Sequence, residues 1–287
     1  MTNRYNIPPE SAHSVLAELK HEFLTTGESV ALTEELTAIL QGVHARDFMQ
    51  RNTMPNFRMQ QVMSAVEVTD TQCPELHRIF QNALKNLEDL FGPELPPHVR
   101  KTTLWRKLDA NANATSLAFQ GADPVIIITD SLLRLVSDAS GKYIVPELTA
   151  VLMHELGHVV YADCECLFCM KIYTTLLRDG TIGGELCALT QAQAANKLFT
   201  GLEFTADRVM FKTSEWPSIL NVFAKLAGGY GGETIDGELF FKQLEKLDPN
   251  AEAVITTGIM MANPHQPILE RLKELKNFRE NHTLGNT

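Results

Sequence analysis

Apolar residues recur at helical spacing over most of the chain. Between residues 74 and 90 they fall every three or four positions, which predicts an amphipathic helix that ends before the proline-rich stretch 93–97. The same spacing predicts two helices within residues 9–50, whereas the polar stretch 51–60 is typical of a linker. In the second half of the chain we expect helices near residues 130–137, 146–177, 186–212, 215–227, 236–245 and 266–280.

The spacing changes to that of strands in the middle of the chain. Residues 102–108 and 115–119 are predicted strands separated by turn-forming residues. Residues 125–129 form an uninterrupted apolar run, which is typical of a buried strand. One small sheet among many helices predicts an α+β fold that is mostly helical.

Length and pattern together suggest three regions. A chain of 287 residues has room for one large domain or two small ones, at about 150 residues per domain. We divide it into an N-terminal helical region (1–60), a main domain (61–280) and a flexible tail (281–287). The N-terminal helices could cover a cleft, bind a partner or pack against the main domain, and packing is the interpretation we favour.

Composition excludes several classes of protein. Hydrophobic residues make up 44% of the chain, enough for a sizeable core, and the net charge of −10 argues against binding nucleic acid or an anionic membrane surface. No apolar stretch approaches the ~20 residues of a membrane helix, and the first residues lack the apolar core of a secretory signal. The five cysteines are an odd number, which favours a reducing compartment. We therefore expect a soluble cytoplasmic protein without an integral membrane segment, although signal-independent export stays open.

The segment with the clearest chemistry is VLMHELGHVV, at residues 151–160. It contains His-Glu-x-x-His, and on a helix residues four apart lie ~40° apart and one turn along the axis. His154 and His158 could then both reach one Zn²⁺ at ~2.1 Å, with Glu155 beside them and free to contact a water molecule rather than the metal. The surrounding residues are so apolar that the helix should be buried, and buried histidines need partners such as a metal ion.

Two histidines leave a catalytic zinc site short of one protein ligand. Glu203 and Asp207 lie four residues apart in a later predicted helix, so one face of it presents two carboxylates. One of them could bind the metal while the other orients a ligating histidine. The alternative is an ordinary solvated acidic face, paired with Arg208 or Lys212, and spacing alone does not decide between the two.

These two segments together, VLMHELGH and EFTAD (203–207), resemble the HtpX-like gluzincin metallopeptidases, the family that includes the CaaX prenyl endopeptidase. The resemblance covers roughly residues 70–278. Unlike many members, this chain has no predicted membrane helix. Weaker similarities support the assignment at Asn113-Ala114 followed by Gly121 and VIIIT, at Glu147-Leu148, at Lys225-Leu226-Ala227-Gly228-Gly229, and at Pro264-His265 with Arg271 and Leu275.

The resemblance implies a zincin-like (gluzincin) core built around an active-site helix, with one Zn²⁺ per chain and a polypeptide substrate. It implies that Glu155 is the catalytic base and that Asp207 orients a histidine ligand. His265 is a candidate for oxyanion stabilisation or for regulation. The resemblance further implies that the zinc ligands are His154, His158 and Glu203. It also implies that an extended substrate pairs with the strand formed by Ser116, Leu117, Ala118 and Phe119.

The expected function is therefore that of a zinc-dependent metalloendopeptidase, in which a metal-activated water attacks the peptide bond and Glu155 is the general base. The alternative is a catalytically silent or self-inhibited zinc-binding protein that acts as a protein-interaction or chaperone-like module. Cys169 lies ~16 Å along the predicted helix from His158, too far to join the same zinc. Cys164, Cys166 and Cys169 point in different directions around that helix, so they cannot converge on one metal, and we expect free thiols there.

Overall fold

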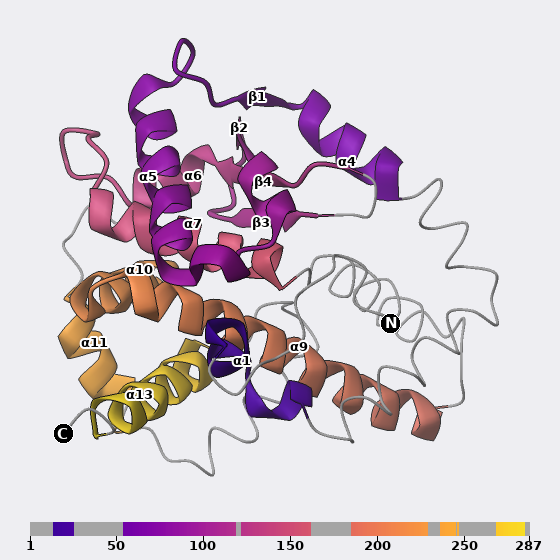
Figure 1. Cartoon of the computed structure of the whole chain (residues 1–287). Helices are drawn as coiled ribbons and strands as arrows, with labels where there is room; N and C mark the ends of the chain where they lie inside the picture. The colour runs from indigo at the N-terminus through magenta and orange to yellow at the C-terminus, as the bar shows by residue number, and fades with distance from the viewer. Residues whose placement is uncertain are drawn as a thin grey trace.

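The computed structural model describes residues 14–25, 54–118, 122–161, 185–228, 236–244, 246 and 268–284. Helices dominate this part of the chain, and they surround one four-stranded sheet, which confirms the predicted α+β class. Figure 1 shows the sheet and α5 (Pro74–Phe91) on one side of α7 (Val145–Val160). On the other side of α7 lie α9 (Glu185–Thr213), α10 (Trp216–Gly228) and α13 (Ile268–Leu284).

The sheet has the strand order β1-β2-β4-β3. Strands β2 (Thr103–Lys107) and β4 (Val125–Thr129) run parallel in the centre, and β4 is buried along its whole length, as its apolar run predicts. Strand β3 (Ala114–Leu117) pairs antiparallel with β4 and forms one edge of the sheet, where it contacts α7. The other edge is β1 (Ala65–Glu67), which the sequence did not predict because three residues are too few to show an alternation.

The remaining helices agree with the predicted positions to within a few residues. They are α6 (Asp130–Leu135) and α11 (Gly237–Leu244). The 3₁₀ turns η3 (Gly92–Glu94) and η4 (Pro97–Lys101) begin in the proline-rich stretch, where the sequence predicts only the end of a helix. Within the described residues, no helix has the length and apolar character that crossing a membrane requires.

One prediction of irregular structure is wrong, and one helix ends later than predicted. The stretch 51–60 is not simply a linker, because residues 54–63 form helix α4 (Met54–Met63). Its second residue is Pro55, and proline fits the first turn of a helix, where its missing N–H has no partner to lose. Helix α13 also ends at Leu284, four residues beyond the predicted end at residue 280. Both stretches are polar and lack a regular apolar face, so the spacing of hydrophobic residues could not identify them as helices.

The described part of the N-terminal region packs onto the main domain. Helix α1 (Val15–Leu19) and the 3₁₀ turn η1 (Glu22–Thr25) contact α9, and Leu19 is fully buried in the common core. The Tyr161 hydroxyl donates a hydrogen bond to the Leu16 carbonyl at 2.8 Å, and the His21 backbone N–H donates to Thr205 Oγ1 at 3.0 Å. The second predicted N-terminal helix lies outside the described residues.

Because Leu19 is part of the common core, Leu19→Ala should destabilise the whole protein. We expect the free energy of unfolding to fall by about 2–5 kcal/mol, the usual cost of such a cavity. Urea denaturation followed by circular dichroism measures this change. Leu108→Ala is the matched control, since Leu108 is 81% exposed and its loss should cost less than about 0.5 kcal/mol. An unchanged transition for Leu19→Ala would mean that the N-terminal segment is not part of this core.

Candidate metal centre

Helix α7 is covered on opposite sides, which explains why polar residues in it are buried. Strand β3 and helix α5 contact it from one side, and α9 and α10 from the other. Its N-terminal turn contains Pro146 and Glu147, and the Glu147 carboxylate pairs with Lys225 Nζ at 2.6 Å. Every residue from Ala150 to Val160 is buried, including both histidines and the glutamate of the motif.

Three side chains converge between α7 and α9. His154 Nε2 lies 3.5 Å from one carboxylate oxygen of Glu203, and His158 Nε2 lies 3.4 Å from the other. One ligand atom from each residue lies within 4.8 Å of those of the other two. Three ligands bound at ~2.1 Å to one tetrahedral ion are ~3.4 Å apart, so the spacing suits a single metal ion. The residues present therefore fit the ion that the sequence motif implies.

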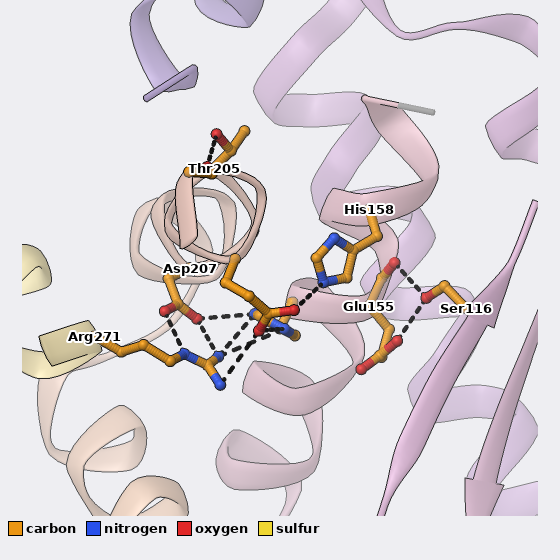
Figure 2. Close-up of polar contacts among 9 residues, drawn as sticks. Ser116, Glu155, His158, Thr205, Asp207 and Arg271 are labelled. Atoms are coloured by element: carbon orange, nitrogen blue, oxygen red, sulfur yellow. Dashed lines mark hydrogen bonds and ion pairs between the residues drawn. The ribbon is translucent and has the colours of Figure 1, made fainter. Parts of the chain in front are cut away.

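A buried ion pair sets the orientation of His154. Asp207 Oδ1 lies 2.8 Å from His154 Nδ1, and a carboxylate can only accept, so Nδ1 carries the proton and donates it. Nε2 is then the nitrogen with an available lone pair, and it is the one that faces Glu203. Arg271, from α13, fixes Asp207 in turn by donating from Nε and Nη2 to both of its carboxylate oxygens, at 2.7 and 2.6 Å. Figure 2 shows the Arg271 guanidinium facing the Asp207 carboxylate.

The same contacts shift the ionisation of the two partners. Burial raises the pKa of Asp207, but the charge and hydrogen bonds of Arg271 outweigh it, so the pKa lies below its usual value and the group stays ionised. Burial and the neighbouring Arg271 lower the pKa of His154, whereas Asp207 and Glu203 raise it, and the net shift is upward. Asp207 therefore acts on His154 as a fixed negative charge.

The charge of the cluster also suits a divalent cation. Glu155, Glu203 and Asp207 contribute three carboxylates and Arg271 one guanidinium, and all four side chains are nine-tenths or more buried. With neutral histidines, these four groups leave a net charge of −2 inside the core, which is costly without a counterion. One divalent ion at the His-His-Glu group would bring this sum to zero.

The Glu155 carboxylate faces edge strand β3 of the sheet. The Ser116 hydroxyl, on edge strand β3, lies 2.6 Å from Glu155 Oε2 and 2.8 Å from the Glu155 backbone carbonyl oxygen (Figure 2). The carboxylate therefore lies between the substrate-strand candidate and the histidines.

Comparison with known proteins agrees with this geometry. The model of peptidase family M48 matches residues 71–279. The chain belongs to this family. Peptidases of this family are metal-dependent, which agrees with the His-His-Glu group between α7 and α9.

One curated relative is the plastoglobule-localized metallopeptidase 48, chloroplastic, of Arabidopsis thaliana. It is 27% identical over 211 residues, which cover 72% of this chain and 56% of the relative. The chain thus spans little more than half the length of that protein. No solved structure gives a significant match.

The glycine of the His-Glu-x-x-His segment lets α7 and α9 approach closely. A Cβ atom added to Gly157 would lie 2.9 Å from Cα of Ala206, closer than real Cβ contacts. Gly157 precedes the ligand candidate His158, and Ala206 lies between Glu203 and Asp207 in sequence. The small residues of both motifs therefore bring the polar residues of the two helices within reach of one another.

The solvated acidic face, left open from spacing, is wrong for Glu203 and Asp207. They are 2% and 0% exposed. Arg208 and Lys212 pair with other carboxylates instead, including Glu274 and Glu18 respectively. Both acidic residues are therefore buried beside His154 rather than in solvent.

A second group of residues that could bind a metal ion lies next to α9, where η1 and α13 meet it. His21, Glu22 and Glu274 come close enough to hold an ion. However, the Arg208 guanidinium already donates to both carboxylates, at 3.0 and 2.6 Å. A cation therefore already occupies this position, and the group is better described as an ion-pair cluster that joins η1, α9 and α13.

Sequence reasoning missed one residue of the site and named several that cannot be placed. Arg271 had been given no role, although it lies three residues after Ile268 and four before Leu275, on the apolar face of α13. An arginine at a position whose neighbours on the same helix face are apolar is expected to be buried and paired with an acid, and this pattern could have identified Arg271. The remaining candidates lie outside the described residues: Phe119, His265, Cys164, Cys166 and Cys169.

Because Gly157 lies against the backbone of α9, Gly157→Ala should force the two helices apart. We expect a loss of about 1–3 kcal/mol in unfolding free energy and a drop of about tenfold or more in metal affinity. Thermal unfolding and competition with a chelating dye measure the two effects. Gly201→Ala is the control, since its Cβ would meet side-chain atoms alone, those of Leu24 at 3.0 and 3.1 Å and of His21 at 3.7 Å, and no backbone of a facing helix. A gain in stability for Gly157→Ala, as expected for a helix without this contact, would contradict the account.

Proposed function

We propose that this chain is a zinc-dependent metalloendopeptidase in which His154, His158 and Glu203 bind the metal and Glu155 is the general base. The observation that carries the proposal is the spacing of 3.4 and 3.5 Å between the Glu203 oxygens and the two Nε2 atoms. Two imidazoles and one carboxylate are a usual ligand set for catalytic zinc, and the nitrogen donors favour Zn²⁺ over Mg²⁺ or Ca²⁺.

Each side chain of the centre then has a distinct task. When bound, zinc supplies Lewis acidity, which lowers the pKa of a water molecule toward ~7 and polarises the peptide carbonyl. Glu155 accepts a proton from the attacking water and delivers it to the leaving amine. Asp207 and Arg271 hold the His154 ring so that Nε2 faces the metal position.

The substrate in this proposal is a polypeptide in extended conformation. Strand β3 is an edge of the sheet and contacts the helix that carries Glu155, which supports pairing of a substrate strand with it by β-augmentation. Ser116, Leu117 and Ala118 are the described residues of this candidate surface. The cytoplasmic location expected from the sequence stays a prediction, and the Arabidopsis relative is named as chloroplastic.

A catalytically silent zinc protein is the competing function. The position of Glu155 supports the enzyme instead, because a structural metal site has no need of a carboxylate that does not bind the metal. Glu155 is 94% buried next to the ligand candidates, and such burial of a charge is hard to explain without a chemical task.

Glu155→Gln tests the proposal because it removes the base without removing a ligand. We expect zinc content like that of the wild type and a fall in peptidase activity of roughly 10²–10⁴-fold, the usual contribution of a general base. Cleavage of unfolded casein, with and without a chelator, measures activity, and elemental analysis measures zinc. Glu238→Gln, at an exposed position on α11, is the matched control and should keep full activity. Near wild-type cleavage by Glu155→Gln would exclude Glu155 as the base.

A further inference from the structure

Resting on the proposed function, we infer that Ser116 is a positioning residue for the general base. Its hydroxyl fixes the Glu155 carboxylate through one oxygen, Oε2, and leaves the other, Oε1, for the reacting water. Ser116 also belongs to the strand that is proposed to pair with the substrate. It therefore connects the base to the strand that holds the peptide bond.

The geometry favours the carboxylate over the backbone as the main partner of this hydroxyl. Ser116 Oγ lies 2.6 Å from Glu155 Oε2 and 2.8 Å from the Glu155 carbonyl oxygen. A hydroxyl has one proton, and a hydrogen bond to a charged acceptor is the shorter and stronger of the two. Figure 2 shows Ser116 pointing from the strand toward α7, with both contacts on the same glutamate.

The strand places this hydroxyl with little freedom. Ser116 pairs with Ile126, which is fully buried in the central strand β4, so the backbone at this position is held by the sheet. Side chains alternate along a strand, so Ser116 and Thr115 point to opposite faces, and only Ser116 is directed at α7. Glu155, in contrast, has three rotatable side-chain bonds and needs a contact of this kind to keep one position.

A hydroxyl also suits both states of the base. When Glu155 is ionised, Ser116 donates to it, and when Glu155 carries the proton taken from water, the lone pairs of Ser116 Oγ can accept. The contact can therefore persist while the proton moves from water to Glu155 and from Glu155 to the leaving amine. Misplacement of a reacting group by ~1 Å can reduce the rate about 10²-fold, so a fixed carboxylate is expected to matter for turnover.

The test compares Ser116→Ala and Ser116→Thr with the wild type in steady-state cleavage of a fluorogenic peptide derived from casein, with zinc content measured in parallel. We expect Ser116→Ala to lower kcat by about 10- to 100-fold while KM and zinc content stay unchanged. Ser116→Thr keeps the hydroxyl and should restore kcat to within a few fold. Ser137→Ala is the control, since Ser137 also donates a hydrogen bond to a backbone carbonyl, that of Leu133, and lies outside the site.

Each outcome bears on a different claim. A raised KM with unchanged kcat in Ser116→Ala would overturn the inference, because the hydroxyl would then serve substrate binding alone. Unchanged kcat in an active protein would overturn the inference and leave the proposed function intact. A wild type that holds zinc but cleaves nothing would overturn both. If Ser116→Ala does not fold, Ser116→Cys replaces it, since a thiol has a similar shape but is a weak donor, and the same loss of kcat is expected.

Discussion

The close packing of α7 against α9 is the contact on which the site depends. Gly157 and Ala206 allow the helix backbones to approach. Close to this contact, the ligand candidates His154 and His158 of α7 face Glu203 of α9. Helix α7 supplies two imidazoles and α9 supplies the carboxylate, so neither helix holds the site alone. A shift of one helix relative to the other would separate the Nε2 atoms from Glu203 and change the metal position.

Burial of charge is the second constraint, and the surrounding elements meet it in different ways. Asp207 is compensated by Arg271, which reaches the site from α13. Three residues further along α13, Glu274 pairs with Arg208 of α9, so the same helix docks through two ion pairs. The N-terminal segment contacts α9 beside this second pair, through Glu22. Elements far apart in the sequence thus support the short stretch of α9 that holds Glu203 and Asp207.

The sequence alone predicted the parts of the structure that follow a local rule. The spacing of His154 and His158 on a helix, the buried strand 125–129 and the amphipathic helix at 74–90 were all confirmed, because each depends on residues close together in the chain. It could not decide whether Glu203 and Asp207 were buried, since that depends on α7 covering them. Arg271 and the Ser116 contact with Glu155 were missed for the same reason, because both join segments that are distant in sequence. Helix α4 was missed because its residues favour a helix without forming an apolar face.

The most direct test of the account is the metal content of the purified protein, measured by mass spectrometry for the wild type and for His154→Ala after both have been supplied with zinc. The account predicts about one zinc ion per chain in the wild type and its loss in the variant, because His154 contributes one of three ligands and the Asp207–Arg271 pair then has no ligand to orient. Absence of metal from both proteins, with the wild type folded, would contradict the assignment of His154, His158 and Glu203 as a metal centre.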